Sequence, residues 1–301
     1  MDDMMDVVDQ QGQPHKITRS QYSVQLMNAA RQNWSNLDVL RQIGPQLLTD
    51  GFPKEALEVA EHACELSSGH VPDLYWRSAA LAETGRLDEA AAAFEEIIED
   101  AAYPHDIARA TLGLAKVRAR QNRIDETMVL LDTAVDTDPA NPQLLLAVYG
   151  FYNERGEAAR GMEKVMRFVE KRPHSPVGYR ALAQIAASAC EKDELKRRIH
   201  EALSRASTEE EKQDLLAELT FLLGQQSMPH EIIALVEPHI QQVHQPFALL
   251  NLAQALLDVG RVDHSRQLLE AIKHASPPEM HPMIDQRLGQ LDQHEKPAAP
   301  A

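Results

Sequence analysis

The histidines, cysteines and carboxylates are the residues of this chain best suited to chemistry, and their spacing matches no catalytic motif. The sequence has no phosphate-binding glycine loop, no dinucleotide fingerprint, no nucleophile elbow and no HExxH zinc motif. His62 and Cys64 are two residues apart on a predicted helix and so point to different faces, and His239 and His244 lie across a predicted helix end. We therefore expect no enzyme, no catalytic residue, no metal site and no cofactor.

A basic run is the one local concentration of charge that is suited to binding. The whole chain has 30 Lys and Arg against 46 Asp and Glu, a net charge of −16, and this acidity argues against binding nucleic acid or anionic lipid. Between His105 and Ile124 the balance reverses, with five basic residues and one acid. The basic residues are Arg109, Lys116, Arg118, Arg120 and Arg123. Because an arginine offers a rigid fork of donors to a carboxylate, the run predicts a contact with an acidic or C-terminal segment of a partner protein.

The cysteine count and the apolar runs predict a cytoplasmic protein without membrane insertion. Cys64 and Cys190 are the only two cysteines, which excludes a disulfide scaffold. The acidic start has no apolar region of the kind found in secretory signals. The longest nearly apolar run, residues 247–257, is too short to span a bilayer.

A repeat of about 34 residues organises the chain. Each of its landmarks follows one apolar-periodic stretch and precedes another: Gly51, Gly85, Asn122, Gly156, Cys190, Gly224 and Gly260. Gly and Asn tolerate the left-handed backbone of a tight turn, so each unit is predicted to be a helix A, a short turn and a helix B. With the landmark numbered 15, the units start at Leu37, Val71, Ala108, Pro142, Pro176, Glu210 and Pro246.

Three positions of the unit predict how its helices pack. Position 8 is small in six of seven units, Tyr149 being the exception, so that helix A can lie close to helix B. Positions 24 and 27 are apolar in every unit, which predicts a buried stripe on helix B. In the sixth unit, Pro229 predicts that helix B starts late.

These features resemble the tetratricopeptide repeat family, which shares the 34-residue period, the small position 8, the turn glycine and the two apolar positions. The second unit is the nearest match, with Gly85 to Ala90 and Phe94. The resemblance implies an all-α fold, a right-handed α-solenoid of about seven helix-turn-helix repeats with capping helices. It also implies a non-enzymatic scaffold or adaptor that binds a peptide or helical segment of a partner in a concave groove lined by helix A.

Two other functions are alternatives. One is an assembly or accessory subunit of a secretion, pilus or envelope machine, against which the absence of a visible signal counts. The other is a solenoid-fold enzyme, for which the sequence offers no polar cluster.

The resemblance assigns positions 2, 5, 9, 12 and 13 of each unit to the groove. The predicted partner-binding residues are therefore Arg109, Lys116, Arg120, Asn153 and Arg180. The alternative is that these side chains form ion pairs with neighbouring acids. Groove positions of the first two units hold Asp38, Arg41, Tyr75 and Ala79, a poor match to the Lys and Asn pattern by which some family members bind chaperone tails, so we do not assign that activity.

Both ends of the chain differ from the repeats. We predict an extended arm over residues 1–17, a capping helix over 18–36 that a capping box at Thr18 and Gln21 opens, the solenoid over 37–278, a second capping helix over 279–293 and a disordered tail over 294–301. One hypothesis is that the acidic arm, MDDMMDVVD, occupies the basic groove of its own or a neighbouring molecule. A disordered start is the alternative, and the oligomeric state stays open.

Overall fold

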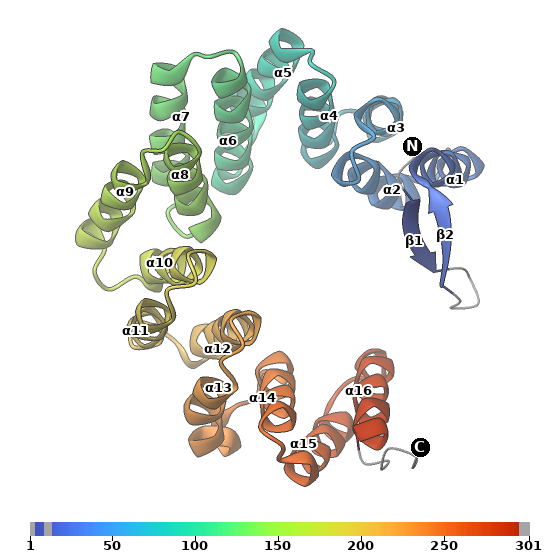
Figure 1. The fold of residues 1–301 in the computed structure, drawn as a ribbon. Coiled ribbons are helices and arrows are strands. Elements are labelled where there is room, and N and C mark those ends of the chain that lie inside the picture. Colours follow the sequence, from blue (N-terminus) through green and yellow to red (C-terminus); the bar gives the residue numbers. More distant parts are fainter. Residues whose placement is uncertain (1–3, 9–13, 295–301) are drawn as a thin grey trace. The chain divides into compact units, whose positions relative to one another are not determined.

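The computed structural model describes residues 4–8 and 14–294. The chain divides into two compact units, 1–139 and 140–301, each of which contains several of the 34-residue units of the sequence. The predicted all-α fold is confirmed, because helices make up almost all of the described chain and the only strands are two short ones near the start. Each unit is a stack of antiparallel helix pairs, the arrangement of a tetratricopeptide-like α-solenoid (Figure 1).

The first unit contains a hairpin and seven helices among its described residues. They are β1 (Met4–Val8), β2 (Pro14–Thr18), α1 (Arg19–Gln32), α2 (Leu37–Thr49), α3 (Pro53–Ser67), α4 (Val71–Glu83), α5 (Leu87–Asp100), α6 (Pro104–Arg120) and α7 (Ile124–Thr137). The A helices are α2, α4 and α6, and the B helices are α3, α5 and α7. Each helix packs mainly on the next one in the chain.

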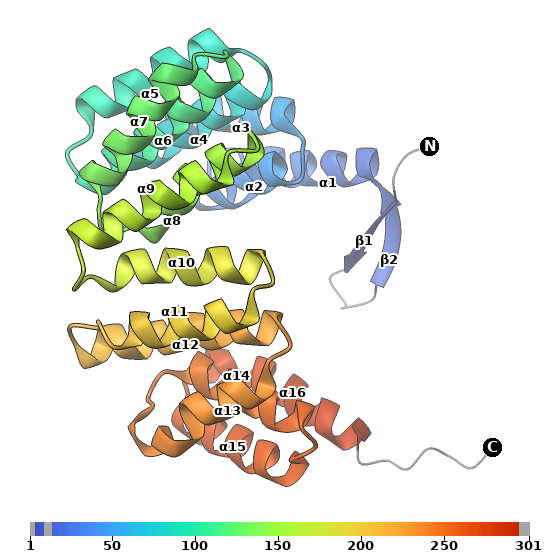
Figure 2. The ribbon, with the colours of Figure 1, turned by 60° about the vertical axis from the view of Figure 1, so that its left-hand side comes forward.

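The second unit continues the same alternation. Its helices are α8 (Pro142–Glu154), α9 (Ala158–Lys171), α10 (Pro176–Ser188), α11 (Lys192–Leu203), α12 (Glu209–Gln225), α13 (Pro229–Val236), the 3₁₀ helix η1 (Glu237–Gln242), α14 (Pro246–Asp258), α15 (Val262–Ala275), the 3₁₀ helix η2 (Pro278–Met280) and α16 (His281–His294). Figure 2 shows α10, α11 and α12 lying side by side in this unit.

The start of the first unit is a hairpin that leads into a capped helix. Strands β1 and β2 pair antiparallel, with Met4 opposite Thr18, and both contact α1. The predicted capping box is present, because the Gln21 N–H donates to Thr18 Oγ1 at 3.1 Å and the Thr18 N–H donates to Gln21 Oε1 at 2.9 Å. Residues 1–3 and 9–13 of the predicted arm, and residues 295–301 of the predicted tail, lie outside the described residues.

Six of the seven landmark residues adopt the left-handed backbone that the repeat predicts. Their φ angles run from 57° at Cys190 to 84° at Gly85. The sixth landmark is wrong, because Gly224 lies inside α12 and Ser227, with φ 51°, makes the turn instead.

The predicted late start of the sixth helix B is wrong for the same reason. When the sixth unit is numbered from Ser227, Pro229 opens α13 at position 17, the position at which Pro53 opens α3. The small residue at position 8 is then Thr220, which is fully buried. The spacing of the sixth repeat is longer because α12 has an extra turn at its start. Helix α12 begins four residues before position 1, as α6 does in the third repeat. The sequence landmark failed because a serine replaces glycine at the turn.

The predicted buried stripe on helix B is confirmed in six units. The side chains at positions 24 and 27 differ in size, but all of them are buried: Ala60, Ala63, Phe94, Ile97, Leu131, Ala134, Val165, Phe168, Ile199, Ala202, Leu269 and Ile272. In the sixth unit the corrected register brings Val236 to position 24, and it is also fully buried. This stripe is the buried apolar face of helix B.

The small residue at position 8 accommodates the next helix A as well as its own helix B. A Cβ atom added at Gly44 of α2 would lie 2.3 Å from two ring carbons of Trp76 in α4, so the indole occupies the space that a side chain would take. The equivalent positions on α8 and α10 are Tyr149 and Ala181. In this pair of repeats the large residue therefore lies on α8 and the small one on α10, the reverse of α2 and α4.

We expect Gly44→Ala to destabilise the first unit although alanine is the better helix former. Displacing the Trp76 ring costs more than the gain in helix propensity, which leaves a net loss of about 1–2 kcal/mol in the free energy of unfolding. Gly150→Ala in α8 is the matched control, because nothing lies within 4 Å of a Cβ there. It should stabilise by about 0.5–1 kcal/mol. Urea unfolding of both variants checks the opposite signs, and two shifts of the same sign would contradict this packing.

A buried ion pair fastens α2 to α4. The Asp73 side chain is fully buried and accepts from Arg41 Nε at 2.9 Å and from Arg41 Nη2 at 2.7 Å. Burial raises the pKa of the Asp73 carboxyl, but the hydrogen bonds from Arg41, Ser67 and Trp76 and the charge of Arg41 outweigh burial and hold that pKa below its ordinary value. The pair therefore stabilises the folded chain most when Asp73 is ionised.

We expect Asp73→Asn to lower the free energy of unfolding at pH 7 by about 3 kcal/mol, because it leaves Arg41 without its counter-ion. A carboxyl with a lowered folded-state pKa adds stability above its unfolded value of about 3.9 and loses it as pH falls through the folded value. The difference between wild type and variant should therefore be constant from pH 7 to about 5 and shrink below about 4. Urea midpoints across this range measure it, and a constant difference at all pH values would exclude the assignment.

Candidate interaction surface on the A helices

Three of the five predicted partner-binding residues form a row on one face of α6. Arg109, Lys116 and Arg120 are spaced by seven and four residues, which places them within a narrow sector of the helix, and all three are exposed. We call these three residues the α6 row. The structure thus groups them as the sequence predicts.

Arg109 is held in place by an aromatic ring rather than by an acid. Its guanidinium carbon lies 3.8 Å from the centroid of Tyr75 in α4, and Tyr75 itself meets Phe94 edge to face at 5.6 Å between centroids. Stacking uses the face of the guanidinium and leaves its N–H edge open for a carboxylate. Tyr75 therefore positions the Arg109 side chain, and it occupies a groove position of the second repeat.

The other two members of the row differ in their partners. Arg120 Nη1 donates to Glu83 Oε1 of α4 at 3.0 Å, so for this residue the alternative of a neighbouring ion pair is correct. Both side chains are well exposed, and such a pair contributes little stability and exchanges readily. Lys116 makes no hydrogen bond or ion pair with any residue that the structure describes. The centre of the row is therefore a cation without a counter-ion.

The remaining two basic residues of the run, Arg118 of α6 and Arg123 just before α7, pair with acids of the B helices. Arg118 is largely buried and bridges Glu95 of α5 at 2.5 Å and Glu126 of α7 at 3.6 Å, and Arg123 also pairs with Glu126, at 2.5 Å. Helix α5 carries six acids and no Lys or Arg, and α7 carries four acids and none. The positive charge of the first unit is thus concentrated on helix α6.

The other two predicted residues lie in the second compact unit, residues 140–301, so the five residues form two groups. Asn153 is exposed near the end of α8. Arg180 of α10 is half-buried and forms an ion pair with Glu218 of α12, whose other oxygen accepts from Gln184 Nε2 at 2.6 Å. Arg180 Nε is buried and has no partner among the described residues. Arg180 is therefore neutralised within the chain, as the alternative predicts.

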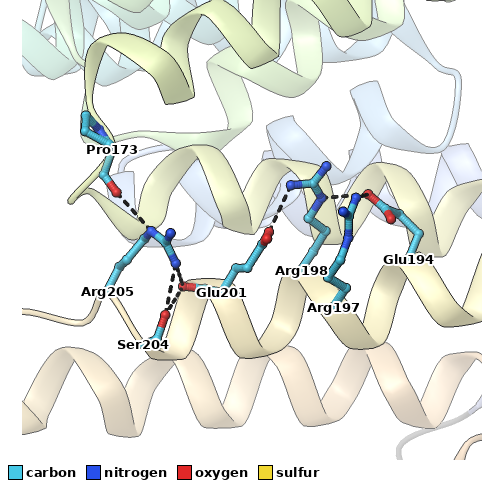
Figure 3. A network of polar contacts seen from close by, with 7 residues as sticks. All are labelled: Pro173, Glu194, Arg197, Arg198, Glu201, Ser204 and Arg205. Atoms are coloured by element: carbon cyan, nitrogen blue, oxygen red, sulfur yellow. Dashed lines mark hydrogen bonds and ion pairs between the residues drawn. The ribbon is translucent and has the colours of Figure 1, made fainter.

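Cationic side chains on the B helices of the second unit are also engaged. Figure 3 shows Arg197 and Arg198 donating to Glu194, while Arg205 Nε donates to the carbonyl of Pro173 at 2.9 Å. Lys196 joins α11 to α13 through Glu231 at 2.5 Å. The contacts of Arg205 and Lys196 join neighbouring repeats, while those of Arg197 and Arg198 lie within α11.

The histidine and cysteine that drew attention in the sequence have structural contacts. The His62 ring stacks on Trp34 at 4.3 Å between centroids, and its Nε2 lies 2.9 Å from the Trp34 carbonyl oxygen. Burial raises the pKa of the Cys64 thiol to about 11, so it carries almost no thiolate at neutral pH. Across the residues that the structure describes, no three His, Cys, Asp or Glu side chains gather as metal ligands.

Within the same described ranges, no helix combines the length and the apolar character needed to cross a membrane. The described part of the hairpin contacts α1, and the structure does not test whether the acidic arm binds the α6 row of a neighbouring molecule.

The sequence did not predict the acids that pair with the A helices, although the repeat holds a signal for them. Glu83 and Arg120 both occupy position 13, in consecutive units, and so lie at corresponding points of adjacent A helices. Comparing equal positions of neighbouring repeats would have found this pair. Glu218 occupies a predicted groove position of the sixth repeat, but it does not share its position number with Arg180, so this comparison would not have found their pair.

Comparisons with known proteins agree with this fold. A sequence model described as a tetratricopeptide repeat matches residues 42–107 and 80–142. The crystal structure of yeast Tom70 is similar with a TM-score of 0.52 and 13% identity, over 92% of this chain and 59% of that one. This chain therefore spans less than two thirds of the Tom70 chain. No protein with a curated description matches the sequence.

Two further solved structures have lower scores. A tetratricopeptide repeat protein from Parabacteroides merdae has a TM-score of 0.39 and 11% identity, over 85% of this chain and 98% of that one. The TPR2AB domain of yeast Sti1, solved in a complex with pHSP90, has a TM-score of 0.34 and 16% identity, over the same shares. The family model shows tetratricopeptide repeats over residues 42–142, and the likeness to Tom70 shows the same fold, so the chain is a tetratricopeptide-repeat α-solenoid.

Proposed function

We propose that this protein is a non-enzymatic scaffold or adaptor that binds a peptide or helical segment of a partner protein on its A helices. The tetratricopeptide repeat is in general a protein-interaction scaffold. In the first unit the α6 row contacts acidic side chains or the terminal carboxylate of the bound segment. Asn153 and Arg180 belong to a second contact region in the other unit.

The exposed, unpaired Lys116 between two arginines is the observation that carries this proposal. Arg109 is held by Tyr75 with its N–H edge open, and Arg120 has only an exposed partner in Glu83. An acidic segment can therefore bind all three cations without breaking a buried interaction. The strongly acidic α5 and α7 direct an acidic partner toward α6 by repulsion.

The other functions gain less support. No contact among the described residues favours an assembly subunit of a secretion, pilus or envelope machine, or an enzyme. We further propose a cytoplasmic location, which the unpaired Cys64 and Cys190 support because reducing compartments keep thiols free.

A charge-neutralising triple variant tests the α6 row. In Arg109→Gln/Lys116→Gln/Arg120→Gln, the dissociation constant for a fluorescein-labelled Glu-Ala repeat peptide with a free C-terminus should rise about tenfold, as expected for the loss of three exposed charge contacts. Fluorescence anisotropy at two salt concentrations measures it, and the wild-type affinity should fall with added salt.

The matched control removes the same charge from a B helix. Arg160→Gln/Arg167→Gln/Lys171→Gln in α9 changes three exposed cations and should leave the peptide affinity near that of wild type. Circular dichroism checks that both variants are folded. Equal affinities for wild type and for the α6 variant would rule out this surface.

A further inference from the structure

The last helix of the second unit places an arginine against α14 without an acidic partner. Arg287 of α16 donates from Nη1 to the backbone carbonyl of Leu250 at 2.8 Å. It makes no other hydrogen bond or ion pair with the residues that the structure describes. The helix is fixed by its own apolar side chains, because Ile284 and Leu291 are fully buried in a cluster with Leu250 of α14.

Other contacts between successive A helices pair the guanidinium with a carboxylate. Arg41 meets Asp73 between α2 and α4, and Arg180 meets Glu218 between α10 and α12. Between α14 and α16 no ion pair joins the side chains that the structure describes. Asp285 of α16 accepts from Lys273 at 2.6 Å, and Asp258 of α14 accepts from Gln254 at 2.8 Å.

The single contact of Arg287 leaves most of its donors unused. A guanidinium has five N–H groups, and the Leu250 carbonyl takes one of them. That carbonyl lies inside α14 and already accepts the N–H of the residue four positions on, so Arg287 adds little to the helix. Burial lowers the pKa of the Arg287 guanidinium, and no neighbouring acid opposes the shift. The charge is therefore held half-buried at a cost in stability.

An apolar group lies on the same face of α14. Phe247 precedes Leu250 by three residues, about 4.5 Å along the helix axis, and 54% of its surface is exposed. A large exposed ring within one helical turn of the carbonyl that Arg287 contacts offers, together with that cation, two contacts of different chemistry to one ligand.

We propose that Arg287 binds a carboxylate of a partner peptide and that Phe247 contacts an apolar side chain beside that carboxylate. The site lies in the second unit and is independent of the α6 row. An anion would supply the counter-ion that the described residues do not provide, and a forked pair with Nε and Nη2 would leave the bond to Leu250 intact.

Small probes on the full-length protein test the chemistry. N-acetylphenylalanine carries the carboxylate and the ring, its amide lacks the charge, and acetate lacks the ring. Titrations followed by the ¹⁵N–¹H signals of α14 and of the arginine Nε groups should give about tenfold weaker binding for the amide than for the acid, as expected for the loss of a charge-assisted pair. Acetate should bind more weakly than N-acetylphenylalanine through the same signals.

Variants assign the effect to the two residues. Arg287→Gln should remove the preference for acid over amide, and Phe247→Ala should weaken N-acetylphenylalanine but leave acetate unchanged. Arg197→Gln, at an exposed arginine of α11, and the α6 triple variant should both bind the probes as wild type does. Equal affinities for acid and amide, or no saturable shift with any probe, would overturn the proposal.

A stability measurement separates a binding role from a structural one. Because the Arg287 charge is half-buried without a counter-ion, Arg287→Met should keep or raise the melting temperature while it removes the preference for the acid. A lower melting temperature together with unchanged probe binding would show that Arg287 serves the fold alone. The α6 row is tested with the Glu-Ala repeat peptide and Arg287 with the small probes, so either proposal can fail without the other.

Discussion

Each helix A must be buried on two sides, and this constraint governs both units. It packs against its own helix B and against the next helix A, and in α10 ten of thirteen residues are buried as a result. Only a narrow stripe remains for contact with a partner, and in α10 it consists of Arg180, Gln184 and Ser188. The chemistry of binding is therefore limited to about one side chain per helical turn.

Charge on that stripe is mostly cancelled across neighbouring helices. Arg41, Arg120 and Arg180 each face an acid on an adjacent helix A. Arg109, Lys116 and Arg287 face no acid among the described residues. Selectivity for a partner then depends on cations of this kind more than on the total of basic residues, because a cation that already has a carboxylate gains little by exchanging it.

Most of the architecture could be predicted from the sequence, because the turn residues and the buried stripes repeat with a fixed period. The prediction failed at the sixth unit, where Ser227 replaces the glycine and Gly224 sits in a helix. Candidate site residues were harder to predict. Their positions on helix A followed from the repeat, but whether a cation is paired depends on a residue one repeat away, as with Arg120 and Glu83. Arg287 gave no sequence signal, since its environment is made by the fold of α14 and α16.

The corrected turn at Ser227 brings out a longer period in the chain, of three repeats. The turns at Gly51, Gly85 and Asn122 recur 105 residues later at Gly156, Cys190 and Ser227, and helix α6 recurs with the same length as α12. A block of three repeats, with the long helix A third, is thus present twice. The two copies differ where they are exposed, because Arg109 and Lys116 correspond to Asp214 and Phe221. The two blocks share one arrangement of turns and long helix, and their exposed positions differ in charge and polarity.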